Sequence, residues 1–241
     1  TTDVAAAFGV ILATYYFIKS LKLPSFKNIA FAGVAFGIAE LLKFSLILLI
    51  PFFVLLGFIW FLTKAGKFLQ VVKTGFLVLL IGFVLIGFVY QYHVWNYPAE
   101  KQLSDAQVYL RDTEDFVKNP ILWATDKPAL RAYAHYFTGV AMILQRVAGG
   151  NTTYFLGEVS NLGWWYYFPI VYLIKEPLAF HILTLVALLY GLWLLFRSKF
   201  WLKTHFTEFA MLSFIAFYWL VSIKGSLNIG VRHLLPVFPF T

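Results

Sequence analysis

Residues 29–62 read IAFAGVAFGIAELLKFSLILLIPFFVLLGFIWFL, an apolar stretch that is interrupted by the charges of Glu40 and Lys43. A transmembrane helix needs about 20 consecutive apolar residues to cross the hydrocarbon core of a bilayer. The stretch is therefore too long for one crossing and short for two. We expect a helical hairpin of two short helices that turns near residues 43–45.

The charges that flank this stretch set its direction in the membrane. Short connections rich in Lys and Arg mark the cytoplasmic side of a membrane protein. Two cytoplasmic flanks require an even number of crossings between them, so 29–62 has to go out and return, with Lys43 at or near the outer face. Three connections carry positive charge and no acidic residue, namely Lys19, Lys22 and Lys27, then Lys64, Lys67 and Lys73, and finally Arg197, Lys199 and Lys203.

The whole chain has the composition of a membrane protein. Of its 241 residues, 61% are hydrophobic and 12% are charged, whereas ordinary soluble domains are about 25% charged. These values exclude a soluble globular protein, a disordered chain and a nucleic-acid-binding module, despite the net charge of +8. The absence of cysteine excludes disulfides, thiolate zinc sites and a cysteine nucleophile.

The remaining apolar stretches complete an all-α fold, a polytopic transmembrane helix bundle of about six spans plus a truncated one. The other spans are expected at 4–23, 75–95, 176–196 and 206–223. Charge parity makes 75–95 and 206–223 outward crossings and 176–196 an inward one. The chain thus divides into transmembrane spans over 1–95, an extracytoplasmic segment over 96–175 and C-terminal spans over 176–241. Without an initiator methionine, it is most simply a fragment of a larger integral protein of the inner or plasma membrane.

The segment 96–175 is expected to be mostly helical and exposed to water. Its positive and negative side chains nearly balance, as a translocated segment tolerates. Apolar periodicity predicts amphipathic helices over 105–117, with Ser104 as N-cap, and over 129–148, ended by two glycines. Residues 164–168, WWYYF, are typical of an interfacial aromatic belt just before the chain re-enters the membrane.

The candidate functional groups gather on the outer face in this topology. Charged groups at membrane depth are costly and are by default functional candidates. Cations there would hold an anionic lipid head group such as a phosphate, and an acidic residue would orient a hydroxyl or hold a divalent cation, Mg²⁺ or Mn²⁺. These candidates are Asp3, Lys43, Lys224, Arg232 and His233.

Each candidate also has a plain structural alternative. Asp3 would cap a helix that starts at Val4, and Lys43 would pair with Glu40 at i, i+3. Lys224 would extend from a helix end to the interface. Arg232 suits bidentate phosphate contact, while His233 is open between a base, a second phosphate donor and a packed polar residue.

Several stretches together resemble a known family. They are TTD at 1–3, GVAFG at 33–37 leading to LKF at 42–44 and Pro51, YFLGE at 154–158 followed by GWWYYFP at 163–169 and KEP at 175–177, and NIGVRHLLPVFP at 228–239. In order and spacing they resemble bacterial members of glycosyltransferase family 39, the dolichyl-phosphate-mannose protein mannosyltransferase-like family. That family belongs to the C-type, polyprenyl-phosphate-dependent glycosyltransferases.

The resemblance implies an inverting transfer of a hexosyl or pentosyl residue from a polyprenyl-phosphate donor at the extracytoplasmic face. The acceptor would be a hydroxyl of a protein, lipid or glycan. Asp3 would be a catalytic acid near the donor phosphate or a metal, and Lys43, Arg232 and His233 would bind the phosphate. Glu158, Trp164 and Tyr166 would line the carrier or acceptor groove.

The family's proposed base lies in a first outer loop that would precede this chain, so we expect the chain alone to be inactive. Two other classes compete. A transporter or flippase of lipid-linked sugars also needs outer cations, but it predicts repeat symmetry and interrupted helices, and the sequence has no clear repeat. A non-catalytic assembly subunit predicts that Asp3→Asn and Arg232→Ala leave function intact.

Overall fold

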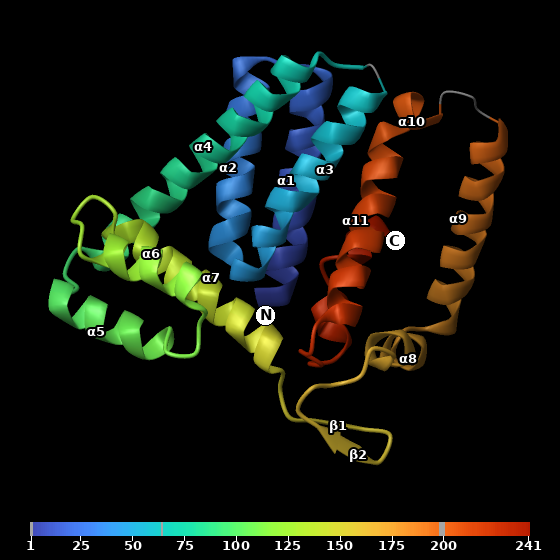
Figure 1. The fold of residues 1–241 in the computed structure, drawn as a ribbon. Helices are drawn as coiled ribbons and strands as arrows, with labels where there is room; N and C mark the ends of the chain where they lie inside the picture. Colours follow the sequence, from blue (N-terminus) through green and yellow to red (C-terminus); the bar gives the residue numbers. More distant parts are fainter. Residues whose placement is uncertain (1, 64, 198–200) are drawn as a thin grey trace.

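The described part of the chain is an all-α bundle in which four helical stretches are long and apolar enough to cross a membrane (Figure 1). The structure, a computed structural model, describes residues 2–63, 65–197 and 201–241, without the side chains of 194–197. Outside this description lie four groups named in the sequence analysis: Thr1, Lys64, Lys199 and the side chain of Arg197. The four stretches are α1 (Thr2–Lys22), Phe44–Leu62, α4 (Phe68–Val94) and α11 (Phe206–Lys224).

The predicted helical hairpin is confirmed. It consists of α2 (Phe26–Leu42), the short 3₁₀ helix η1 (Phe44–Leu48) and α3 (Leu49–Leu62). The Ser25 side chain caps α2 by accepting the backbone N–H of Asn28. At 17 residues, α2 is shorter than the four spanning stretches. The chain turns at Lys43, whose extended backbone (φ −162°, ψ 123°) separates α2 from η1.

Tight packing holds the hairpin against its neighbours. Phe17 of α1 stacks on Phe53 of α3 with ring centroids 4.0 Å apart, and both rings are buried. Helix α2 crosses α4 at small residues, since Gly33 and Gly37 face Ile81 and Gly82. Small residues spaced four apart let two helix backbones approach closely, as in many membrane helix pairs.

The outer segment differs from the prediction in one helix. The structure has α5 (Ala99–Tyr109) and α6 (Asp115–Thr125) in place of one helix over 105–117. Ser104 lies inside α5 and caps nothing, so that prediction is wrong. Proline is favoured at the start of a helix, and the chain starts α5 directly after Pro98. The predicted helix over 129–148 is confirmed as α7 (Arg131–Gly149), which ends at Gly150 with φ +73°.

A short β-hairpin follows, which the all-α prediction did not include. Strands β1 (Thr153–Phe155) and β2 (Glu158–Ser160) pair antiparallel. Both turn residues have positive φ, +50° at Leu156 and +92° at Gly157, as the tightest hairpin turns require.

The next predicted span, 176–196, is formed by α9 (Leu178–Arg197), preceded by α8 (Tyr167–Lys175). The two helices are bent by 114° at their break, so the pair is either a re-entrant loop or, counted as one broken span, a fifth candidate crossing. Beyond them come α10 (Trp201–Thr204), α11 and the 3₁₀ helices η2 (Val231–Leu234) and η3 (Phe238–Phe240). The C-terminal apolar run lies against α11, where the rings of Phe240 and Phe214 have centroids 5.3 Å apart.

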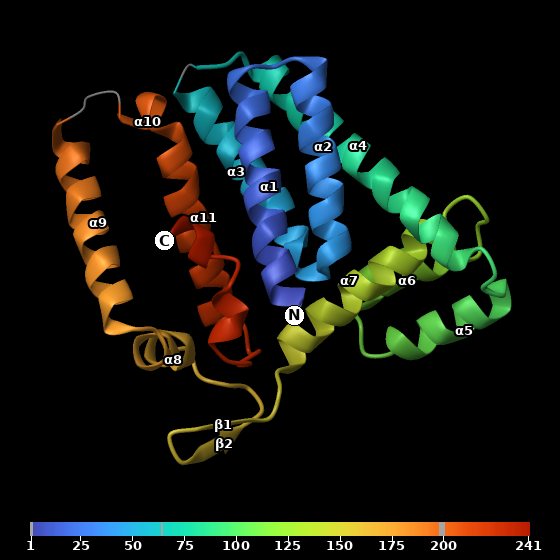
Figure 2. The same cartoon turned by 180° about the vertical axis from the view of Figure 1, so that it is seen from behind.

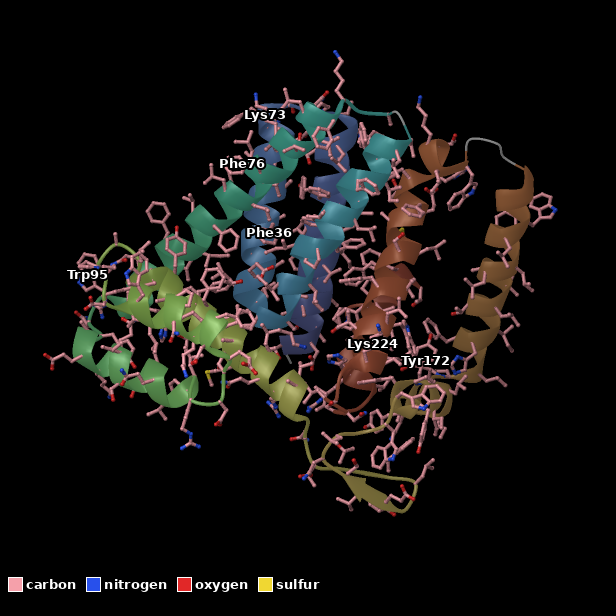
Figure 3. The ribbon with its side chains drawn as sticks, in the orientation of Figure 1. Phe36, Lys73, Phe76, Trp95, Tyr172 and Lys224 are labelled. Atoms are coloured by element: carbon pink, nitrogen blue, oxygen red, sulfur yellow. The ribbon has the colours of Figure 1, made fainter. Side chains whose placement is uncertain are left out.

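The lysine-rich connections share one end of the bundle, as the placement of their positive charges predicts. The connections between α1 and α2 and between α3 and α4 lie at one end, with α10 (Figures 1 and 2). The N-terminus of α1, the turn between α2 and η1, and the C-terminal end of α11 lie toward the other. Lys73 and Lys224 mark these opposite ends in Figure 3. We call the second end the outer end.

Candidate functional site

An ion pair lies at the outer end of the bundle, between the first turn of α1 and the turn of the helical hairpin. Lys43 Nζ lies 2.6 Å from Asp3 Oδ1, and the two side chains are 20% and 12% exposed. The antiparallel packing of α1 on α2 brings these residues together across 40 positions of sequence. An ammonium carries three donors, so two N–H groups of Lys43 stay available to an anion.

The structural alternatives for these two residues are wrong. Helix α1 begins at Thr2, so Asp3 lies in its first turn and does not cap a helix that starts at Val4. Lys43 does not pair with Glu40, because its extended backbone takes its side chain off the face of α2. Glu40 is buried and accepts a hydrogen bond of 2.8 Å from Tyr136 Oη of α7 instead.

His233 lies in η2, packed between aromatic rings. Its ring is 5.3 Å from that of Phe168 and 5.5 Å from that of Tyr218, and its carbonyl accepts from Tyr218 Oη at 3.0 Å. Burial and the positive charge of Lys43 lower the pKa of His233 to about 4, although Asp3 opposes them. These influences show that His233 lies within electrostatic reach of the ion pair. Burial thus favours the neutral form of its imidazole, which packs between the two rings.

This environment predicts an acid-labile fold. The pKa of His233 is below 6.5 in the folded state, so the unfolded state binds the extra proton more readily. We expect the free energy of unfolding to fall as the pH drops from about 6.5 to about 4 and to lose this dependence below that. The measurement is unfolding in mixed detergent micelles across this range. His233→Gln is expected to flatten the slope, and parallel pH curves for the two proteins would contradict the assignment.

Arg232 precedes His233 and is exposed, with no ion-pair partner among the described residues. Gly230, which starts η2, has φ +94°, a conformation that L side chains rarely adopt. Lys224 is exposed in the last turn of α11, which fits the reading of a lysine that reaches from a helix end to the interface. Of the three predicted cations at the outer end, Lys43 is paired, whereas Arg232 and Lys224 have no ion-pair partner among the described residues.

The remaining predicted residues lie around the β-hairpin. Trp164 exchanges two long hydrogen bonds of 3.4 Å with the side chain of Asn228, and its ring lies 5.6 Å from Phe155. The ring of Tyr166 lies 6.2 Å from the same Phe155. Glu158 is exposed on β2 and, within the described ranges, forms no hydrogen bond or ion pair with Asp3, Lys43 or His233.

Asn228 is the residue that sequence reasoning missed. It is buried, its carbonyl accepts from Thr153 Oγ1 at 2.9 Å, and its side chain holds the backbone of Trp164. Gly163 leaves room for this contact, because a Cβ there would lie 2.2 Å from Asn228 Oδ1. Asn228 thereby ties the re-entry segment to the loop that carries Arg232. An asparagine between an apolar helix and a glycine was the available signal.

A divalent cation fits this site poorly. Across the described ranges, no three His, Asp or Glu side chains gather in a way that would hold a metal ion. Asp3 is a single carboxylate whose charge is already compensated by Lys43. Mg²⁺ and Mn²⁺ need several oxygen ligands, so we derive no chemical step through a metal.

The fold and the apolar helices define a polytopic helical protein of the membrane-spanning class. Comparison of the chain with protein-family models, curated proteins and solved structures finds no match. What bears on function is therefore the arrangement of Asp3, Lys43 and Arg232 at the outer end.

Proposed function

We propose that this chain is part of a membrane glycosyltransferase that binds a polyprenyl-phosphate-linked sugar at the extracytoplasmic face. The sugar passes to an acceptor hydroxyl with inversion. The observation that carries the proposal is the ion pair between Asp3 and Lys43, at the end of the bundle opposite the lysine-rich connections. A cation held at the boundary of an apolar bundle suits the phosphate of a lipid carrier.

The charges have separate roles in this proposal. Asp3 positions the Lys43 ammonium, and the two remaining N–H groups of Lys43 bind phosphate oxygens. Arg232, exposed and unpaired among the described residues, contacts the same phosphate through its planar fork. The polyprenyl tail needs no polar group, because it is as apolar as the surrounding lipid.

The reaction is a single displacement at the anomeric carbon. The acceptor oxygen forms a bond to C1 while the C1–O bond to the phosphate breaks, and the bonding pair leaves with the phosphate. The hydroxyl proton passes to a base, a role that we assign to none of these side chains. Lys43 and Arg232 stabilise the charge that develops on the departing phosphate, which is how fixed cations lower such a barrier. Attack opposite the leaving group inverts the configuration.

Binding of undecaprenyl phosphate tests the proposal directly. With the chain in lipid nanodiscs, we expect Lys43→Gln and Arg232→Gln each to weaken binding about tenfold, or about 1.4 kcal/mol. Lys101→Gln removes an exposed cation of α5 and is expected to bind like wild type. Equal affinity in all four proteins, or equal affinity for the uncharged polyprenol, would refute the proposal.

A further inference from the structure

A cavity is formed by the outer segment and the turn of the helical hairpin. Its volume is about 210 Å³. Phe44 of the hairpin turn lines it and directly follows Lys43, so the cavity adjoins the ion pair along the chain. The cavity is also lined by Tyr90 of α4, Asp105 and Tyr109 of α5, and His135 of α7. Tyr97, in the connection after α4, completes this set.

Aromatic rings form much of the wall. The His135 ring lies 5.7 Å from that of Tyr97 and 5.8 Å from that of Tyr90, in tilted or edge-on arrangements. Tyr90 also meets the buried Tyr136 edge-on at 5.4 Å. Each tyrosine ring combines an apolar face with a polar tip. The wall thus suits a ligand that has both apolar faces and hydroxyl groups.

The polar groups of the cavity are held in place. Tyr97 Oη donates a hydrogen bond to Asp105 Oδ2, and this carboxylate raises the pKa of Tyr97 to about 12. Gln102 locks α5 to α7, because it accepts from Arg131 Nε at 2.9 Å and donates to the Arg131 carbonyl at 3.0 Å. The site is therefore preorganised, and such a site loses less entropy on binding.

Several of these groups keep hydrogen-bonding capacity for a ligand. The bond from Tyr97 engages one oxygen of Asp105 and leaves the second able to accept. Burial and the neighbouring His93 lower the pKa of His135, so its neutral ring offers one donor and one acceptor. The cavity combines a carboxylate with phenol and imidazole donors, and none of the described residues that line it is a lysine or an arginine.

This chemistry selects a ligand class. A phosphate would meet the Asp105 carboxylate, while the Arg131 guanidinium behind the wall already donates to Gln102 Oε1 and to the Tyr97 carbonyl. A purely apolar ligand would leave the polar groups unpaired. A sugar ring satisfies both demands, because its C–H faces pack on aromatic rings while its hydroxyls pair with fixed polar groups. At about 30 Å³ per water, the cavity holds roughly seven waters, which is room for a single ring.

We infer that the cavity lined by Tyr90, Tyr97, Asp105, Tyr109 and His135 binds one pyranose ring. Its role as the acceptor subsite rests on the proposed function, whereas the binding of a sugar does not. Asp105 accepts from a ring hydroxyl, Tyr109 and His135 add hydrogen bonds, and the aromatic wall contacts a C–H face.

Saturation-transfer NMR with the chain in nanodiscs tests this inference. The probes are the methyl pyranosides of mannose, glucose and galactose. We expect the ring protons of at least one to saturate, with binding weakened at least about tenfold by Asp105→Asn and by Tyr109→Ala. Asp105→Asn keeps an acceptor for Tyr97. The matched control is Asp112→Asn, whose side chain is 83% exposed and lies outside the cavity lining.

Three results would overturn the inference. The first is that the ring protons of none of the three pyranosides saturate with the wild-type chain, and the second is that both cavity variants bind like the control. The third is competition by choline, which would show an aromatic site for cations instead. Undecaprenyl phosphate binding, measured on the same samples, separates this inference from the proposed function. Asp105→Asn is expected to leave the affinity for undecaprenyl phosphate unchanged. If the wild-type chain did not bind undecaprenyl phosphate, the proposed function alone would be refuted.

Discussion

Replacing Lys43 with Met is expected to lower the free energy of unfolding by about 2–4 kcal/mol, because it leaves the Asp3 carboxylate uncompensated in a largely buried position. Removing one partner of a buried pair usually costs about 3–5 kcal/mol. The residual exposure of the two side chains, 20% and 12%, reduces this penalty through contact with water. Reversible unfolding of the protein in mixed micelles measures the change.

The companion variant Asp3→Asn separates the missing attraction from the unpaired charge. We expect the double variant, Asp3→Asn with Lys43→Met, to be more stable than Lys43→Met alone, because it has no buried charge without a partner. Lys224→Met, which removes an exposed cation from the end of α11, is the control and is expected to change stability little. Additive single effects in this cycle would show that the ion pair contributes nothing.

Substituting Gly82 with Ala is expected to destabilise the protein by about 1–3 kcal/mol, because the added methyl group overpacks the crossing of α2 and α4. A Cβ at this position would lie 2.3 Å from Cδ1 of Phe36. The Phe36 ring is fully buried, with Phe53 and Phe83 beside it, so it cannot move aside cheaply. Unfolding in mixed micelles again provides the measurement.

Gly75 offers a matched control on the same helix. A Cβ there would meet no atom within 4 Å. Gly75→Ala is therefore expected to be neutral or slightly stabilising, because alanine has a higher helix propensity than glycine. If the two variants were equally stable, close packing of α2 on α4 would not be the reason for glycine at position 82.

Local sequence signals predicted the helical framework well. The apolar run 29–62 with a lysine near its middle predicted a hairpin turning at 43–45, and the chain turns at Lys43. The predicted helix over 129–148 matches α7 within two residues at its start. The β-hairpin was missed because Leu156 precedes Gly157 where asparagine or aspartate is the usual signal. In the outer segment, apolar periodicity alone placed a helix over 105–117, although the chain starts α5 after Pro98 and breaks before Asp115.

The candidate site could be predicted only in part. Sequence reasoning gathered Asp3, Lys43 and His233 at one end of the bundle, but its local alternatives paired Lys43 with Glu40 and made Asp3 a cap. The structure instead joins Lys43 to Asp3 and Glu40 to Tyr136. Asn228, which holds Trp164, carried no local pattern strong enough to single it out.

The sequence by itself determined that this is an all-α membrane-type bundle, where its long apolar helices lie and which connections share an end. Span length and the placement of lysines are local properties, and they act through the bilayer rather than through contacts. Only the tertiary structure decided which polar groups pair at the outer end and which residues line the cavity. Those pairings join residues such as Asp3 and Lys43, 40 positions apart, and they depend on how closely packed helices bring their ends together.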